Sequence, residues 1–362
     1  MADVDAIRTA LESVTYPVLD RTLGELGLIR DVSAGRLGSA TVSIALPVIG
    51  HPSDEALQAA ITEACQDVRG VRSVQVDVTE LDEAEQVELM DRLTEEAPAV
   101  NGPGARTRVI SVSSGKGGVG KSSVTTNLAV ALARTGHRVG VMDADVWGFS
   151  IPRMLGTPPA PVLIGRSIIP PAAHGVKVMS MDYFVGDEKA VIWRGPMLHK
   201  AMQQFIEDVF WDGPDFLLVD TPPGTGDVAI SLSQFLPRAQ MLLVTTPQPT
   251  AQRVARRAGL MAAEVDQELM GVVENMSWFT GDDGKRYELF GAGGGAELAG
   301  QLDVPLLGQV PLLTAVREGA DVGIPAVVAA PGSEVEQAFD AIALEVVARK
   351  PRVRTHPDLV IR

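Results

Sequence analysis

The sequence is poor in cysteine, in positive charge and in long hydrophobic runs, and each shortage excludes a class of protein. Its 362 residues include one cysteine, Cys65, so no intrachain disulfide can form and no metal site can use several thiolates of one chain. The 46 acidic residues outnumber 31 basic ones, and the net charge of -15 disfavours binding to nucleic acid or an anionic membrane. No run of about 18 apolar residues occurs, and the acidic N-terminus is unlike a signal peptide. We therefore expect a cytoplasmic protein with neither a nucleic-acid nor a membrane partner.

What the chain does contain indicates two folded domains. Its length corresponds to about two domains of ~150 residues, and 46% of its residues are hydrophobic. Residues 1–106 hold 19 of the acidic residues but only 8 of the basic ones. The prolines and glycines of residues 98–104 follow a charged helical segment and are typical of a flexible connector. The predicted parts are a small domain at 1–93, a linker at 94–106, a large domain at 107–349 and a basic tail at 350–362.

Hydrophobic periodicity assigns both domains to the α/β class. In the small domain, helices are expected at residues 4–13 and 53–67 and strands at residues 40–46 and 73–78. In the large domain, strand-like apolar runs alternate with helical stretches. These runs are residues 108–112, 139–142, 215–219, 240–244 and 269–273. Continuous apolar strands separated by helices predict a mostly parallel sheet covered by helices on both faces.

A glycine-rich loop, GKGGVGKS at residues 115–122, predicts a nucleotide site. It follows the strand RVISVSS and opens the helix SSVTTNLAVALAR, and so satisfies G-x-x-x-x-G-K-[ST] in the required context. Glycines let backbone N–H groups surround phosphates, Lys121 reaches the β and γ phosphates, and Ser122 ligates Mg²⁺. The residues predicted to bind ATP here are Gly115, Lys116, Gly117, Gly118, Val119, Gly120, Lys121, Ser122 and Ser123. The large domain is therefore expected to be a P-loop NTPase that uses ATP and Mg²⁺.

Lys116 is a second lysine within this loop. The loop resembles the deviant loop of a class of ATPases, and this resemblance implies that the extra lysine reaches across a homodimer and offsets transition-state charge as an arginine finger does. A solvated lysine is the alternative interpretation. With Lys121, Lys116 forms the predicted catalytic pair of cations.

Three aspartates follow apolar strands and complete the predicted site. Asp143 and Asp145 come after one strand and Asp220 after another, so all three are expected at the carboxyl edge of a parallel sheet, where ligands bind in this architecture. Asp220 fits an acid that holds Mg²⁺ through water, and Asp143 fits a further magnesium contact. Asp145 fits the group that positions the attacking water. Helix capping is the alternative role for Asp143 and Asp220.

With these residues, the chain resembles the Mrp/ApbC family of iron–sulfur cluster carrier ATPases, which is related to the cell-division ATPase MinD. The motifs that carry the resemblance are GKGGVGKSS, DADVWGFSIPRMLG, WRGPM, LLVDTPPGTGD, VTTPQ, GVVENMS and GAGGG. The N-terminal region resembles the MIP18-like small domain often fused to these carriers, through LGELGLI at residues 23–29. The resemblance implies an adenine contact at Asn275 and a nucleotide-lining loop around Pro311. It also implies an ATP-hydrolysing homodimer that carries clusters, with apo iron–sulfur proteins or assembly factors as partners.

The chain departs from this family at the cluster ligands. Where the family usually shows C-P-x-C, the sequence has Gly281 and Gly284, and the small domain's usual Gly-Cys-Pro has His51 in place of the cysteine. Four soft ligands are needed to bridge a cluster between two subunits. Cys65 lies at helical spacing from apolar neighbours, so we expect an inward-facing structural thiol, and a dimer would offer only two. An iron–sulfur cluster is thus implied by the resemblance, but its ligands are unknown.

Three functions therefore compete. The first is an ATP-hydrolysing cluster carrier that delivers clusters to apoproteins. The second is an ATP-dependent adaptor or scaffold without its own cluster, which the missing cysteines favour. The third is a positioning ATPase like MinD or ParA, against which the net charge and the proline-broken tail argue.

Overall fold

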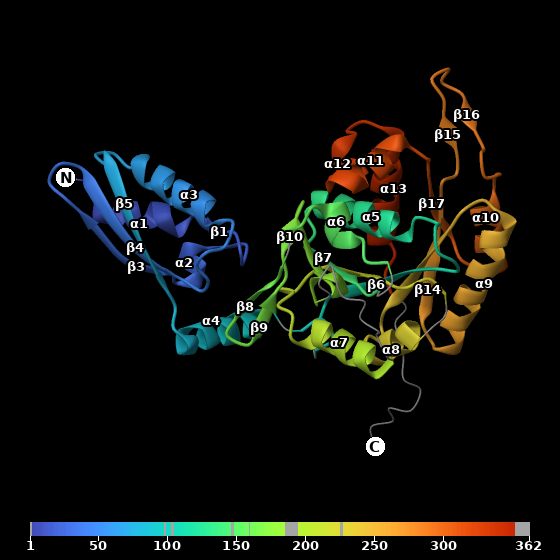
Figure 1. The fold of residues 1–362 in the computed structure, drawn as a ribbon, viewed down its shortest axis with the longest axis horizontal. Helices are drawn as coiled ribbons and strands as arrows, with labels where there is room; N and C mark the ends of the chain where they lie inside the picture. The colour runs from blue at the N-terminus through green and yellow to red at the C-terminus, as the bar shows by residue number, and fades with distance from the viewer. Residues whose placement is uncertain are drawn as a thin grey trace. The chain divides into compact units, whose positions relative to one another are not determined.

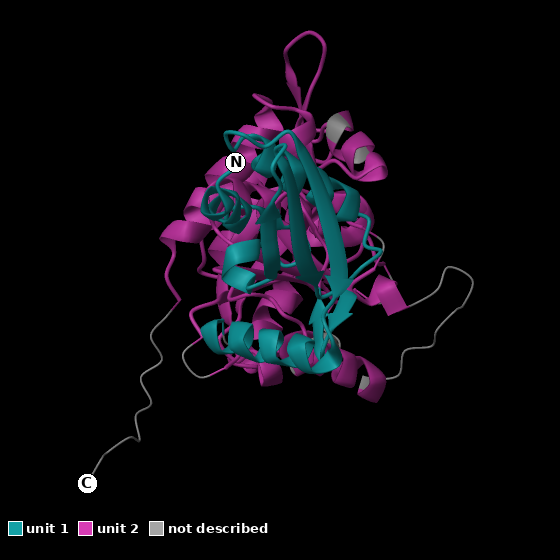
Figure 2. Cartoon of the chain, turned by 90° about the vertical axis from the view of Figure 1, so that its left-hand side faces the viewer, with its two compact units in different colours: residues 1–97, 162–169 teal, residues 98–161, 170–362 magenta. Residues whose placement is uncertain are grey.

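The chain forms two compact units. In a computed structural model, the described residues are 2–97, 99–102, 105–145, 148–158, 160–184, 195–224 and 227–351. Unit 1 comprises residues 1–97 and 162–169, and unit 2 comprises residues 98–161 and 170–362 (Figures 1 and 2). No helix among these described residues is long and apolar enough to cross a membrane.

Unit 1 is a small α/β domain built on a three-stranded sheet of order β3-β4-β5, in which β4 pairs antiparallel with β3 and parallel with β5. Its elements are α1 (Val4–Glu12), β1 (Thr15–Tyr16), β2 (Arg21–Thr22), α2 (Leu23–Leu26), β3 (Ile29–Ala34), β4 (Ser39–Leu46), α3 (Asp54–Gln66), β5 (Ser73–Glu80) and α4 (Glu83–Glu96). The apolar side chains of α1 and α3 face inward; Ile7, Leu11, Leu57 and Ile61 are buried. At the start of α4, Asp82 and Glu85 form a capping box, which fixes where this acidic helix begins.

A hairpin from much later in the sequence completes unit 1. Strands β8 (Val162–Ile164) and β9 (Ser167–Ile169) pair antiparallel. The backbone N–H of Gly165 at the turn donates to Oε1 of Gln86 on α4, over 3.1 Å. Gly165 has a φ of 58° and lies against Val87, so this turn requires glycine. The sequence did not predict that this hairpin belongs with the first 97 residues.

Unit 2 is built on an eight-stranded sheet of order β10-β11-β7-β12-β6-β13-β14-β17, in which all neighbours are parallel except β10 and β11. Its strands are β6 (Arg108–Ser114), β7 (Val139–Asp143), β10 (Ala172–Ala173), β11 (Val176–Ser180), β12 (Phe216–Asp220), β13 (Gln240–Thr245), β14 (Glu268–Asn275) and β17 (Leu306–Val310). Every residue of β7, β12 and β13 is buried, as expected for a parallel sheet covered on both faces. The strand before the glycine-rich loop, β6, lies centrally, between β12 and β13.

Helices cover both faces of this sheet. Figure 1 shows α5, α6, α11, α12 and α13 on one side and α7 and α8 on the other. The helices are α5 (Lys121–Arg134), α6 (Ile151–Leu155), α7 (Gly195–Glu207), α8 (Asp227–Phe235), α9 (Pro249–Glu264), α10 (Gly294–Gln301), α11 (Thr314–Val322), α12 (Ala326–Ala329) and α13 (Glu334–Ala348), with a 3-10 turn η1 (Met181–Phe184). One large apolar cluster joins α5 and α13 to the sheet, and another joins α9 and α10 to β13 and β14.

The predicted fold class is confirmed: a mostly parallel sheet with helices on both faces, preceded by a small α/β domain. All five predicted strands of the large domain are present as β6, β7, β12, β13 and β14. Residues 98, 103 and 104 of the predicted linker and residues 352–362 of the predicted basic tail lie outside the described residues.

Candidate nucleotide site

The glycine-rich loop connects β6 to α5 and lines a cavity of about 450 Å³. Gly118 and Gly120 have φ values of 80° and 78°, a conformation that side chains rarely adopt. A Cβ atom at Gly115 would lie 2.2 Å from the backbone nitrogen of Ala255, so this glycine lets the loop pack directly against α9. The residues lining the cavity are Ser114, Lys116, Gly117, Gly118, Val119, Gly120, Lys121, Ser122, Ser123, Asp145, Gly148, Ser150, Met154, Pro222 and Pro223.

The first turn of α5 brings a cation and a hydroxyl against one carboxylate. Nζ of Lys121 and Oγ of Ser122 each donate to Oδ2 of Asp220, and each distance is 2.6 Å. Oδ1 of the same carboxylate accepts from Oγ1 of Thr125 over 2.7 Å. Asp220 is fully buried and Lys121 almost so. Three donors, one of them the Lys121 ammonium group, thus satisfy both oxygens of this buried carboxylate.

Neighbouring strand ends place the aspartates in a row. Asp143 is the register partner of Asp220 on one side and of Ser180 on the other. Its Oδ2 accepts from Oγ of Ser180 and from the backbone N–H groups of Ser150 and Ile151, and its Oδ1 accepts from the N–H of Asp145. Burial, and next the negative charge of Asp220, raise the pKa of Asp143 to about 7. These contacts are those of a residue that shapes the loop after β7 and caps α6.

Asp145, in contrast, faces the cavity. One of its carboxylate oxygens lies 3.7 Å from Nζ of Lys121. Asp143 holds the backbone N–H of Asp145, and the Asp145 side chain lines the cavity together with the glycine-rich loop. Val146 and Trp147, which belong to the DADVWGFS motif, lie outside the described residues.

These residues fit a nucleotide phosphate chain and Mg²⁺. Gly120 is the N-cap of α5 and supplies no side-chain cap, so the amides of the first turn remain available to an anion. Nothing lies within 4 Å of a Cβ position at Gly117 or Gly118, so the loop is open toward the cavity. The hydroxyl of Ser122 and the carboxylate of Asp220 are hard oxygen donors of the kind Mg²⁺ prefers, and they lie side by side.

Lys116 is held within its own chain. Its Nζ donates to Oε1 of Gln248, the N-cap residue of α9, over 3.3 Å. The lysine is half-buried and lines the cavity edge. The ammonium group of Lys116 is thus paired with α9 of its own chain.

Asn275 and Pro311, for which the resemblance implies contacts with adenine, are not among the residues that line the cavity. Asn275 ends β14 and is 7% exposed; its Nδ2 donates to the carbonyl oxygen of Val119 over 2.9 Å. Pro311 is buried directly after β17.

Gly281 and Gly284, which stand where the resemblance implies cluster-binding cysteines, lie in a β-hairpin. Strands β15 (Phe279–Thr280) and β16 (Arg286–Tyr287) pair antiparallel. The N–H of Gly281 donates to the carbonyl of Lys285, and Gly284 has a φ of 73°. A Cβ at Gly281 would lie 2.9 Å from the ring of Tyr287. The backbone therefore favours glycine at Gly284, whereas a side chain at Gly281 would require the exposed Tyr287 ring to move.

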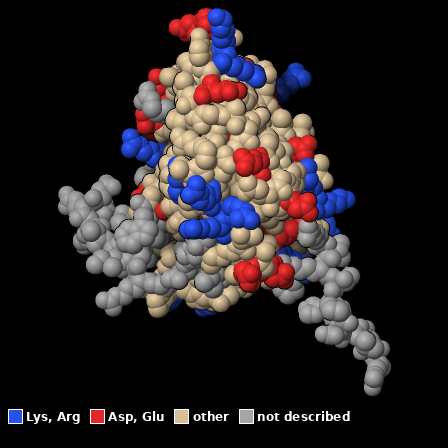
Figure 3. Space-filling view, turned by 90° about the vertical axis from the view of Figure 1, so that its right-hand side faces the viewer, with Lys and Arg blue, Asp and Glu red and all other residues tan. Residues whose placement is uncertain are grey.

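This hairpin carries no soft ligand. It projects from unit 2 in Figure 1, and Figure 3 shows charges of both signs gathered at its tip. Its exposed charged residues are Asp282, Asp283, Lys285 and Arg286. Among the residues that the structure describes, no group of three or more histidine, cysteine, aspartate or glutamate side chains could hold a metal ion.

Cys65 is fully buried on α3, as predicted, and burial raises the pKa of its thiol. His51 stands where the small domain of the family has its cysteine. The Nδ1 atom of its ring lies 2.7 Å from Oγ of Ser53 and accepts a hydrogen bond from the backbone N–H of Ser53. Both side chains thus serve the structure of unit 1.

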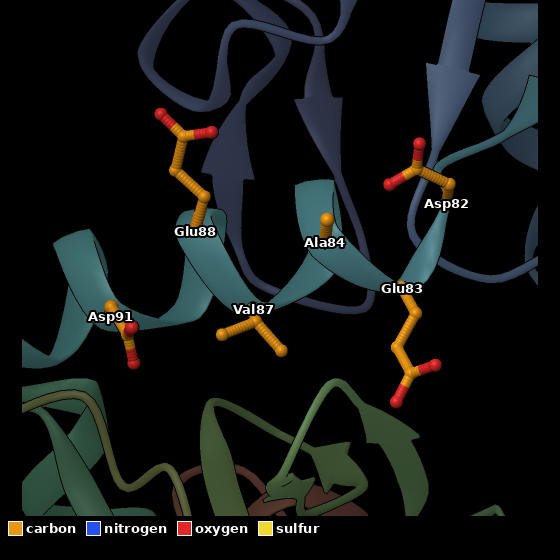
Figure 4. A pocket seen from close by; sticks show the side chains of 6 residues that line it. All are labelled: Asp82, Glu83, Ala84, Val87, Glu88 and Asp91. Atoms are coloured by element: carbon orange, nitrogen blue, oxygen red, sulfur yellow. The ribbon is translucent and has the colours of Figure 1, made fainter.

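A larger, more open hollow runs along α4. It is lined by Asp82, Glu83, Ala84, Val87, Glu88 and Asp91. Figure 4 shows Glu83, Val87 and Asp91 pointing to one side of the helix and Glu88 to the other. The carboxylates do not converge, so this hollow is a solvated acidic helix surface and not a metal site.

Three residues that contact the predicted site residues were not predicted from the sequence. Thr125 lies one helical turn after Lys121, a spacing that could have indicated its contact with Asp220. Ser180 ends the strand beside Asp143, and Gln248 follows the strand VTT, but a single sequence does not reveal which strands are neighbours.

This fold and this site define a P-loop NTPase of the kind related to MinD. An ADP-bound nucleotide-binding protein from Archaeoglobus fulgidus has 29% sequence identity and a TM-score of 0.55, over 69% of this chain and 95% of that one. The cell-division ATPase MinD of Pyrococcus furiosus has 27% identity and a TM-score of 0.51, over 66% of this chain and 98% of that one.

Sequence comparison narrows the class. Residues 105–347 match the family described as NUBPL iron-transfer P-loop NTPase, and residues 4–78 match the family described as iron-sulfur cluster assembly protein. The chain is 46% identical to the iron-sulfur cluster carrier protein of Mycobacterium tuberculosis H37Rv, over 93% of this chain and 91% of the relative. The carrier protein of Synechocystis is 41% identical over 96% of this chain and 98% of the relative. The chain therefore belongs to the family of iron-transfer P-loop NTPases.

Proposed function

We propose that the chain is an ATP-hydrolysing iron–sulfur cluster carrier or assembly factor that serves apo iron–sulfur proteins. The observation that carries the proposal is the convergence of Lys121, Ser122 and Asp145 at one cavity, with the buried Asp220 hydrogen-bonded to both Lys121 and Ser122. It occurs in a chain that shares 46% identity with a protein named as a cluster carrier. We also propose a cytoplasmic location, a homodimer and no nucleic-acid or membrane partner.

Each residue has a proposed role in hydrolysis. Ser122 and, through water, Asp220 would hold Mg²⁺, which would offset the charge of the phosphate oxygens. The loop amides and Lys121 hold the β and γ phosphates, and Asp145 accepts a hydrogen bond from the attacking water. The water oxygen forms a bond to the γ phosphorus as the bond to the bridging oxygen breaks, which leaves ADP, inorganic phosphate and a proton. Lys116 from a second subunit would offset the charge that develops on the bridging oxygen. Asp143 as a further magnesium contact, and Asn275 and the loop at Pro311 as adenine contacts, remain predictions.

Hydrolysis is tested by steady-state phosphate release from the wild type, Asp145→Asn and Asp282→Asn. Asp145→Asn should lower turnover by about 100-fold, because it weakens water positioning, while ADP affinity stays unchanged. Asp282→Asn makes the same substitution on the exposed hairpin and should leave turnover unchanged. Equal turnover in the wild type and Asp145→Asn would overturn the role of Asp145.

The geometry of the β15–β16 hairpin favours one second candidate, an adaptor that binds ATP and an apoprotein but no cluster of its own. The activity regained by an apo iron–sulfur enzyme supplied anaerobically with iron, sulfide and dithiothreitol separates the two. A carrier should speed this recovery in an ATP-dependent way. An adaptor should have no effect unless a separate assembly factor is added.

A further inference from the structure

The conformation of the phosphate loop depends on one side chain outside the loop. The carbonyl oxygen of Val119 accepts a hydrogen bond of 2.9 Å from Nδ2 of Asn275, which lies 156 residues further along the chain. A Cβ atom at the next residue, Gly120, would lie 2.2 Å from the same nitrogen. The loop therefore rests directly on the Asn275 amide.

This contact sets the direction of a peptide group. The C=O of Val119 and the N–H of Gly120 belong to one planar trans peptide unit, so the two bonds point in opposite directions. While Nδ2 holds the oxygen, the N–H of Gly120 must point away from Asn275. Val119 and Gly120 both line the cavity, where inward-pointing amides would bind phosphate.

Asn275 is itself held firmly. It is the last residue of β14, it is the register partner of Val310 on β17, and it is buried. Its Oδ1 accepts from the N–H of Met276, whose φ of 58° is unusual for a residue other than glycine. Glu274, the preceding residue, accepts from Ser277, Gln309 and the N–H of Gly295. The loop thus rests on a rigid strand end.

We propose that Asn275 is a positioning residue for phosphate binding: it aims the Val119–Gly120 peptide so that the loop accepts the phosphate chain. This inference rests on the proposed ATP site and differs from an adenine contact in one measurable way. An adenine contact acts only on nucleotides with that base. A loop-positioning residue acts equally on every ligand with the same phosphates.

The test compares the affinities of ATP, GTP and inorganic tripolyphosphate, with Mg²⁺, for the wild type, Asn275→Ala and Asn275→Asp. Loss of the donor leaves the buried Val119 carbonyl unpaired, so Asn275→Ala should weaken all three ligands by the same factor, about tenfold to a hundredfold. Asn275→Asp should weaken them further, because its carboxylate would face that carbonyl. Gln267→Ala is the control, since Gln267 is also buried and its amide donates to Ser111 on β6 and not to a residue of the loop. The control should bind all three ligands as the wild type does.

A loss confined to ATP would overturn the proposal and establish the base contact instead. Failure of the wild type to bind any of the three ligands would count against the ATP site itself, which is a separate outcome. If both Asn275 variants unfold, the contact can be tested in the wild type by hydrogen exchange of the Asn275 side-chain amide. One side-chain amide proton of Asn275 should exchange slowly with solvent in nuclear magnetic resonance spectra, and rapid exchange of both would refute the contact.

Discussion

Nζ of Lys121 lies 2.6 Å from Oδ2 of Asp220, and both groups are buried. The two charges neutralise one another in the protein interior, and Ser122 donates to the same oxygen. A phosphate chain would compete for the ammonium group while Mg²⁺ competes for the carboxylate. Nucleotide and magnesium would therefore bind together, because the Lys121–Asp220 ion pair would be replaced by a Lys121–phosphate pair and an Asp220–Mg²⁺ pair.

Lys121→Ala should abolish nucleotide binding and also destabilise the protein. Removal of the cation leaves the buried Asp220 without its counter-charge, at a cost of about 3 kcal/mol or more. The double variant Lys121→Ala/Asp220→Asn removes that charge and should regain most of the lost thermal stability without regaining ADP binding by calorimetry. Nucleotide binding by either variant would show that Lys121 does not hold the phosphates.

Lys116→Ala should bind ATP normally but lower the rate of hydrolysis by about 10³-fold. The reason is that the lysine is proposed to act across a dimer as an arginine finger does. Sedimentation should show a dimer that is tighter with ATP than without it. Lys200→Ala, which removes an exposed lysine from α7, is the matched control and should leave turnover unchanged. A fully active enzyme that remains monomeric at all ATP concentrations would contradict the role of Lys116.

Glu334 should stabilise the β15–β16 hairpin in a pH-dependent way. It accepts hydrogen bonds from Thr280, Arg286 and Trp278, which together lower the pKa of its carboxyl group, with the Thr280 bond contributing most. A carboxyl group whose pKa is depressed by folding stabilises the fold above its ordinary value of 4.5, and this advantage is lost as the pH falls through the folded-state value. Because Glu334 is partly exposed, we expect Glu334→Gln to cost only about 1 kcal/mol at pH 7.

Hydrogen exchange of the Gly281 amide, corrected for its intrinsic rate, measures this effect. Exchange should be faster in Glu334→Gln than in the wild type at pH 7, and the difference should shrink below pH 4.5. Glu345→Gln, on the same helix but paired with Arg349, should not change the rate. A difference that persists at low pH would show that charge at Glu334 is not the cause.

Much of this site could be predicted because its chemistry is local in the sequence. The residues from Gly115 to Ser123 carry the phosphate loop in nine consecutive positions, and Asp220 follows a recognisable apolar strand. The contacts of Ser180, Gln248 and Asn275 could not be derived from spacing, because they depend on which strands are neighbours in the sheet. The β8–β9 hairpin was missed for the same reason, since its partner helix lies 79 residues away from Gly165 at Gln86.

The replacement of the family's cluster cysteines can be seen in the sequence, whereas the conformation of the chain at those positions cannot. The sequence shows glycine at positions 281 and 284, but only the structure shows that the hairpin turn uses a positive φ at Gly284 and a close ring contact at Gly281. The buried Cys65 offers no replacement ligand at the surface. If the protein carries a cluster, we expect either that Cys65 is exposed at an interface or that the ligands come from a partner protein or from small thiols.

The central claim is that the protein alone holds no stable cluster. It is tested most directly by the iron and sulfide content of the wild type and Cys65→Ser after anaerobic reconstitution and gel filtration. A bridging cluster needs about four soft ligands, so we expect far less than one cluster per dimer in both proteins. Dithiothreitol present throughout should increase the amount of bound iron, because it can supply thiolate ligands. This iron should be lost when the dithiothreitol is removed. One cluster per dimer that survives gel filtration in the wild type would contradict the account, and its loss in Cys65→Ser would identify the buried thiol as a ligand.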